Sequence, residues 1–187
     1  MAVSSILWRR LDQEGHEAAR LIERPAAWYL EGTAVFASDE RPCRLDYQIV
    51  IDQHWATQGA TIQGWVGDTV IDLTIAVDPE RRWSLNGSEA PAVQGCIDLD
   101  LNFSPVTNLL PICRLALHNG QAAPVRAAWL RFPSFTLEPL DQEYMRIDAG
   151  RYRYSSADGG FTADLAVRPD GFVISYAGLW QMVAGQA

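Results

Sequence analysis

The chain has 187 residues, a net charge of −8 and no lysine, so all fifteen of its basic side chains are arginines. An acidic chain without a basic run is not typical of proteins that bind nucleic acid or an anionic membrane surface. Apolar residues make up 48% of the chain, which indicates a folded globular protein, and we expect one domain over residues 1–187.

Alternation of apolar and polar residues, the pattern of a half-buried strand, recurs along almost the whole chain. Residues 16–23 fit a strand or a helix equally well. The other predicted strands are 6–11, 28–37, 43–52, 61–66, 69–77, 81–85, 114–118, 125–132, 135–139, 142–147, 151–155, 161–167, 172–176 and 179–183. More than a dozen short strands separated by turns predict an all-β fold, a strongly curled antiparallel sheet or an open barrel with few helices.

The stretch 95–115 differs from the rest of the chain. It begins as a predicted strand that places Asp98 and Asp100 on one face. It continues into a loop that combines Pro105 and Pro111 with several large apolar residues, so the loop is expected to pack inward or to face a ligand. Arg114 is the nearest basic residue that could pair with the two carboxylates.

Several interpretations of these carboxylates stay open. With Arg114 they could form a buried ion-pair network, or a polar cluster at the mouth of a cavity that orients a sugar or phosphate headgroup. Residues i and i+2 on one strand face lie roughly 7 Å apart, which also fits an acid–base pair. A calcium loop is disfavoured because Phe103 stands where such a loop needs glycine.

Other candidate residues carry weaker signals. His54 is isolated, and the chain contains no GxSxG, HExxH or P-loop motif, so no cofactor or metal is expected. The three cysteines form no CxxC pair, which argues against a disulfide framework or a zinc site. The aromatic residues that could stack on sugars, line an acyl pocket or belong to the core are Trp28, Trp55, Trp65, Trp83, Trp129, Tyr47, Tyr144, Tyr152 and Tyr176.

Targeting signals give a further expectation. Residues 1–12 hold no apolar run that is long enough for a signal peptide. No segment reaches the roughly 18 apolar residues of a membrane-spanning helix. We therefore expect a cytoplasmic protein without stable membrane insertion.

In several blocks the chain resembles the "putative glycolipid-binding" family of bacterial proteins, a domain of unknown function. The central match covers residues 98–112 and is followed by Arg114 and Leu115; further matching blocks are 45–49, 52, 55–57, 83, 86–87, 95–96, 170–171 and 176–179. The chain departs from the family pattern at Cys113, where arginine is usual, and at Ala177, where proline is usual. The resemblance implies an almost all-β fold, similar to that of bacterial lipoprotein carriers, with a concave hydrophobic face.

The resemblance and the central stretch together predict a non-enzymatic protein that binds a glycolipid or another amphiphilic ligand in an apolar cavity of the curled sheet. The candidate ligand-binding residues are Asp98, Asp100, Asn108, Arg114, Tyr47, Trp55, Phe103 and Tyr176. One alternative is an enzyme on a β-barrel scaffold that uses the Asp98 and Asp100 carboxylates on a small or glycosidic substrate. Another is a protein–protein module that uses exposed edge strands.

Overall fold

One sheet of fifteen strands accounts for most of residues 3–156 and 159–186, the part of the chain that the computed structural model describes. The strand order is β8-β7-β6-β5-β4-β3-β2-β1-β15-β14-β13-β12-β11-β10-β9, so β1 pairs with β15 in the middle of the sheet. Neighbours are antiparallel except β9, which runs parallel to β10. The strands are β1 (Val3–Arg10), β2 (Gly15–Arg24), β3 (Ala27–Ser38), β4 (Arg41–Ile51), β5 (Thr57–Val66), β6 (Thr69–Val77), β7 (Trp83–Leu85), β8 (Ser88–Glu89), β9 (Leu99–Leu101), β10 (Ala122–Arg131), β11 (Thr136–Asp148), β12 (Arg151–Ser156), β13 (Phe161–Val167), β14 (Val173–Tyr176) and β15 (Trp180–Gln186).

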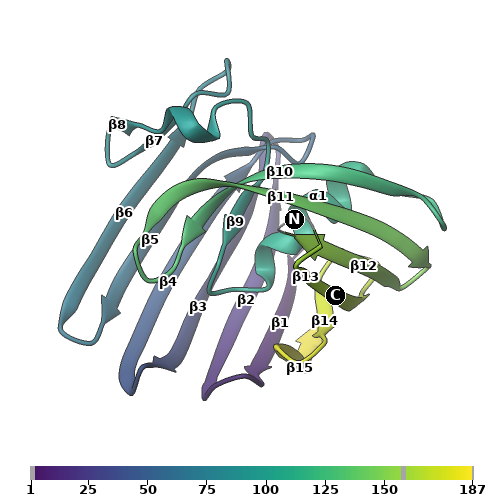
Figure 1. Cartoon of the computed structure of the whole chain (residues 1–187), viewed down its shortest axis with the longest axis horizontal. Helices are drawn as coiled ribbons and strands as arrows, with labels where there is room; N and C mark the ends of the chain where they lie inside the picture. Colours follow the sequence, from purple (N-terminus) through teal and green to yellow (C-terminus); the bar gives the residue numbers. More distant parts are fainter. Residues whose placement is uncertain (1–2, 157–158, 187) are drawn as a thin grey trace.

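The sheet curls strongly without closing: β1–β6 form one side, and β10–β13 curve across it (Figure 1). Glycines allow close contacts between its strands. A Cβ atom at Gly32 of β3 would lie 2.4 Å from the hydroxyl oxygen of Tyr47 on β4. A Cβ atom at Gly64, where φ is +145°, would lie 2.0 Å from the carbonyl oxygen of Arg44. Both positions therefore require glycine.

The concave side of the curl is filled by the chain itself. The central segment, residues 102–115, contains the 3₁₀ turn η2 (Val106–Asn108) and the α-helix α1 (Leu109–Leu115), and it lies between the two sides of the sheet (Figure 1). All residues from 103 to 110 are buried. The ring of Phe103 lies 6.4 Å from that of Phe36 on β3 and 6.3 Å from that of Tyr47 on β4. The central segment is thus an internal part of the core.

Side chains link the segment that leads into β9 to the opposite end of the sheet. The Arg81 guanidinium donates hydrogen bonds to the carbonyl oxygens of Thr57, Cys96 and Ile97 at 2.7, 2.9 and 2.8 Å. The indole nitrogen of Trp83 donates to the same Cys96 carbonyl at 3.0 Å. These bonds hold the curled sheet together where β-ladder pairing is absent among the described residues.

The all-β prediction is confirmed, since the described part of the chain forms fifteen strands and one short α-helix. The strand predicted at 114–118 is wrong: Arg114 belongs to α1, which ends at Leu115 and is followed by Ala116 in the left-handed conformation. Pro111 stands in the first turn of α1, where it removes no helical hydrogen bond, and Leu110 and Ile112 supply the buried face. Residues 16–23, which the sequence left open between strand and helix, belong to β2.

Candidate functional site

Asp98 and Arg114, two predicted ligand-binding residues, form a buried ion pair. The Arg114 guanidinium donates to both carboxylate oxygens, at 3.0 and 2.5 Å, in the bidentate geometry that arginine favours. The Asp98 residue is only 1% exposed. Burial raises the pKa of Asp98, and the arginine opposes that rise. The pair anchors α1 to the segment before β9, which fits the network interpretation.

Asp100 points to a different group of side chains. Gln142 of β11 donates to the Asp100 carboxylate at 2.6 Å and to the hydroxyl oxygen of Tyr154 at 3.1 Å. Burial raises the pKa of Asp100 to about 6, and the nearby Asp98 charge adds to the rise. Tyr176 lies beside this group, with its ring 6.0 Å from that of Tyr154. Asp98 and Asp100 therefore have separate partners.

Asn108 and Phe103 fix the central segment from inside. The hydroxyl of Tyr144 on β11 donates to the Asn108 amide oxygen at 2.8 Å, and the Asn108 amide nitrogen donates to the Pro105 carbonyl at 2.9 Å. Phe103 is 1% exposed and lies within the aromatic core. These contacts stabilise the segment, and neither residue lines the two hollows described below.

Tyr47 belongs to a buried acidic site around Glu17 that the sequence analysis missed. Tyr47 and Ser104 both donate to the same Glu17 carboxylate oxygen, each at 2.5 Å. The other oxygen has no hydrogen-bond partner among the described residues. Burial raises the pKa of Glu17 to about 7, although the two hydrogen bonds and Arg10 oppose the rise. Glu17 is thus an unusually basic carboxylate that links β2, β4 and the central segment.

Trp55 lies away from these groups, in the turn between β4 and β5. Its ring stacks on that of Trp28 with a centroid distance of 4.9 Å. The Asp52 carboxylate accepts hydrogen bonds from the backbone nitrogens of His54 and Ala56 and so shapes the turn. Trp55 borders a small hollow of about 310 Å³ that is also lined by Cys113 and residues of β11–β13. The predicted site residues therefore fall into several separate clusters.

This separation limits the chemistry that the central carboxylates can perform. Both oxygens of Asp98 accept hydrogen bonds from one arginine, which leaves that carboxylate poorly suited to act as a general base. His54 lies in the Asp52 turn, where its backbone nitrogen is bonded. The geometry favours a structural role for the Asp98–Arg114 pair.

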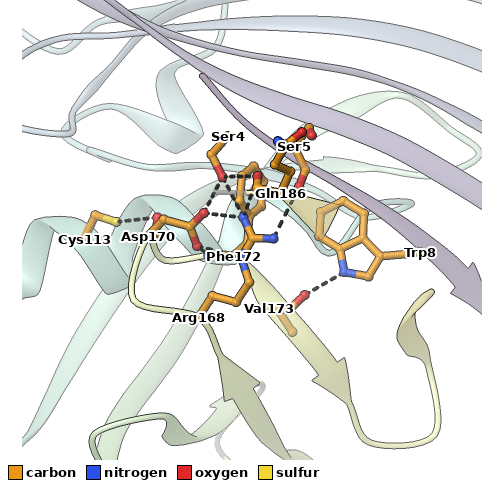
Figure 2. Close-up of polar contacts among 9 residues, drawn as sticks. All are labelled: Ser4, Ser5, Trp8, Cys113, Arg168, Asp170, Phe172, Val173 and Gln186. Atoms are coloured by element: carbon orange, nitrogen blue, oxygen red, sulfur yellow. Dashed lines mark hydrogen bonds and ion pairs between the residues drawn. The ribbon is translucent and has the colours of Figure 1, made fainter. Parts of the chain in front are cut away.

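A polar cluster links β1, β15 and the loop that precedes β14. Arg168 and Asp170 form a bidentate ion pair, and Arg168 also donates to the hydroxyl of Ser4 and to the Ser5 carbonyl (Figure 2). The indole nitrogen of Trp8 donates to the Val173 carbonyl at 2.6 Å. The cluster fixes the start of β1 against the loop that precedes β14.

The larger hollow, about 890 Å³, lies on the outer face of the sheet, opposite the central segment. We call it the outer groove, and it runs across β15, β1, β2, β3, β4 and β5. Its volume lies within the roughly 300–1,000 Å³ typical of small-molecule sites. Its polar side chains on β2–β5 are Arg20, Glu31, Thr33, Asp46, Gln48, Thr61 and Gln63.

Strand register assembles the groove from residues that are distant in sequence. Arg20, Glu31 and Gln48 are successive cross-strand neighbours on β2, β3 and β4. The adjacent row contains the small side chains of Ala18 and Thr33, which leave room above the sheet. The groove is therefore a property of strand pairing, which no single strand reveals.

Hydrogen bonds between neighbouring strands order the polar side chains. Glu31 accepts from Arg20 at 2.5 Å and from Gln48 at 3.0 Å. Asp46 accepts from Thr33 at 2.7 Å and from Arg44 at 2.6 Å. Burial alone would raise the pKa of Glu31, but the bonds from Gln48 and Arg20 outweigh it and lower the pKa. Glu31 is therefore ionised at neutral pH.

An apolar row borders the outer groove on the same face. Val35, Trp65 and Val70 are 51%, 37% and 79% exposed, and Arg44 stands between the first two in the cross-strand register. We call these three residues the apolar rim. Exposed large side chains gathered beside a polar groove are typical of a binding surface.

A metal-binding cluster and a membrane-spanning helix are both absent from the described residues. Within residues 3–156 and 159–186, no three or more histidine, cysteine, aspartate or glutamate side chains are grouped so as to hold a metal ion. In the same part of the chain, no helix has the length and apolar character needed to cross a bilayer.

Comparison with known proteins places the chain in a family. A β-barrel-like protein of a domain of unknown function from Brucella abortus shares its fold, with a TM-score of 0.58 over 98% of this chain and 96% of that one, at 7% identity. A DUF1089 family protein from Pseudomonas aeruginosa is 33% identical, with a TM-score of 0.79 over 88% of this chain and 90% of that one. No functionally curated protein matches. Residues 5–182 match the model of a family described as "Putative glycolipid-binding", and the chain belongs to that family.

Proposed function

We propose that the protein binds a glycolipid without chemically changing it and that the sugar headgroup occupies the outer groove. The single observation that carries this proposal is the groove itself, a hollow of about 890 Å³ lined by ordered polar side chains. The family description supports the ligand class. The cytoplasmic setting expected from the sequence is part of the proposal.

The groove matches the chemistry of a sugar. Hydroxyl groups donate to carboxylates and to amide oxygens, and they accept from amide nitrogens and arginine. Glu31, Asp46 and Gln48 provide such groups on adjacent strands. Thr61 and Gln63 on β5 extend the polar lining. Since rigid strands hold these side chains, little conformational entropy is lost when a sugar binds.

The apolar rim provides a second contact. Trp65 could stack on the apolar face of a sugar ring or contact the lipid near the headgroup, as aromatic side chains with one exposed face do. A polar groove beside exposed apolar side chains suits an amphiphilic ligand. The location differs from the internal apolar cavity expected from the sequence, because the central segment fills the concave side.

The interior remains the competing location for the lipid. For acyl chains to enter there, the central segment would have to leave its contacts with Glu17, Tyr144 and the Phe36 ring. Displacing so many buried apolar side chains into water would be costly at about 25 cal/mol per Å². We therefore favour the groove, which requires no such rearrangement.

A groove-blocking substitution tests the proposal. Ala18 is exposed on the outer face and lines the groove, so Ala18→Trp should fill it without disturbing the core. Ala122→Trp on β10 is the matched control, since Ala122 is exposed on a strand that does not line the groove. Binding is measured by flotation with phosphatidylcholine vesicles that carry a dihexosyl diacylglycerol, and by calorimetry with the free disaccharide.

We expect the unmodified chain and Ala122→Trp to float with the glycolipid vesicles, and Ala18→Trp to remain unbound. Binding of the free disaccharide alone would indicate a sugar-binding protein with no role for the lipid. Equal binding by both variants would contradict the groove as the site, and no binding by any of them would contradict the proposed function.

A further inference from the structure

We infer that the outer groove selects an uncharged glycosyl headgroup and rejects headgroups that carry a phosphate or sulfate. This inference rests on the proposed function and defines its ligand class more narrowly. It follows from the way in which the arginines at the groove are already paired.

Arg20, the arginine that lines the groove, and the nearby Arg44 and Arg168 are each engaged by a carboxylate of the same chain. Arg20 is bonded to Glu31 at 2.5 Å, and Arg44 is bonded to Asp46 at 2.6 Å. At the β1–β15 end, Arg168 forms its bidentate pair with Asp170 and also donates to the carbonyl oxygens of Ser5 and Gln186 (Figure 2). An anionic headgroup would therefore have to compete with an existing carboxylate for each of these three guanidinium groups.

The charged side chains that line the groove also disfavour an anionic headgroup. The charged side chains that line the groove are Arg20, Glu31 and Asp46, which gives one positive and two negative charges. The whole chain carries a net charge of −8. A phosphate or sulfate would approach two carboxylates at short range, and like charges brought together without a counter-ion are strongly unfavourable.

A neutral sugar, in contrast, can form favourable hydrogen bonds with the same carboxylates. Ionised carboxylates only accept hydrogen bonds, and each oxygen can accept more than one. Glu31 and Asp46 can therefore accept from sugar hydroxyls while they keep their arginine partners. The carboxylates act as specificity-determining groups because they favour hydroxyl donors and repel anions.

The experiment compares lipids that differ in headgroup charge. Flotation is measured with phosphatidylcholine vesicles that carry a neutral dihexosyl diacylglycerol, a sulfated hexosyl diacylglycerol or phosphatidylglycerol, and with phosphatidylcholine alone. The double variant combines Glu31→Gln with Asp46→Asn and so releases Arg20 and Arg44 from their carboxylates. Glu143→Gln on β11 is the control, since it removes an exposed carboxylate that does not line the groove.

We expect the unmodified chain and Glu143→Gln to bind only the neutral glycolipid. The double variant should gain binding to the sulfated glycolipid by about tenfold, the effect of one charge-assisted hydrogen bond. Equal binding of neutral and sulfated glycolipids by the unmodified chain would overturn the inference but not the proposed function, and so would a double variant without this gain. Failure to bind any of the glycolipids would instead contradict the proposed function.

Discussion

The two faces of strands β2–β4 shift the pKa of a glutamate in opposite directions. On the concave face, Glu17 is buried with one oxygen unpartnered among the described residues, and its pKa rises to about 7. On the outer face, Glu31 is held by Arg20 and Gln48, and its pKa is lowered. One strand register thus produces an apolar interior that holds a weakly acidic carboxyl group and an outer surface with an ordered, ionised carboxylate. In the proposed function, the interior specifies the fold and the outer face presents the ligand site.

The ion pair of the interior should show the largest effect on stability. Arg114→Ala would leave Asp98 buried without its partner, and losing one member of a buried pair typically costs about 3–5 kcal/mol. The free energy of unfolding is measured by urea denaturation. Adding Asp98→Asn should restore part of the loss because it removes the unpaired charge. A loss below about 1 kcal/mol would mean that the pair does not anchor α1.

The pH dependence of the free energy of unfolding tests the raised pKa of Glu17 on the concave face. Its folded-state pKa of about 7 lies above the ordinary 4.5, so the folded chain binds the proton more tightly than the unfolded chain. The stability linked to Glu17 is full below pH 4.5, falls as the pH rises and levels off above about pH 7. The difference corresponds to about 3 kcal/mol.

Glu17→Gln should remove most of that fall. Relative to the unmodified chain, the variant should gain up to about 3 kcal/mol above pH 7 and almost nothing below pH 4.5. A smaller fall between pH 3.8 and about 6 should remain, because Asp100 also has a raised pKa. Urea titrations over a pH series measure this, and a variant with an unchanged pH profile would contradict the raised pKa of Glu17.

Trp65 should separate binding from stability. Because it is 37% exposed, Trp65→Ala should reduce the free energy of unfolding by about 1 kcal/mol or less. Binding of the neutral glycolipid should weaken roughly three- to tenfold, the range of an aromatic contact worth about 0.5–1.5 kcal/mol. Phe161→Ala is a suitable control, since Phe161 of β13 is 38% exposed and does not line the groove. Equal weakening of glycolipid binding by both substitutions would show that the apolar rim is not part of the binding site.

The sequence predicted most strands because a half-buried strand alternates. It predicted residues 161–167 with the observed bounds of β13. The strand prediction failed where the local alternation of apolar and polar residues disagrees with the packing of the folded chain. Residues 114–118 alternate, yet Arg114 is drawn into α1 by the buried face of that helix and by its bond to Asp98. Residues 135–139 and 142–147 were predicted as two strands and form the single strand β11.

The candidate site was harder to predict. The Asp98–Arg114 pairing was among the open interpretations because the two residues are close in sequence. The outer groove was not predicted, since its polar residues are ordinary outward-facing side chains and only the register of β1–β5 brings them together. Glu17 was missed because its face depends on whether residues 16–23 form a strand. Its apolar neighbours Ala19 and Leu21, two and four residues on, were the available signal.

The most direct test of the account is an amide NMR map of the ligand on the full chain. Titration with a neutral dihexosyl lipid in phosphatidylcholine bicelles should shift the amide resonances of Thr33, Gln48 and Thr61 on the outer face. The amide resonances of residues 103–112 in the central segment should stay unchanged. Large shifts confined to residues 103–112 would contradict the account, because they would place the ligand in the interior.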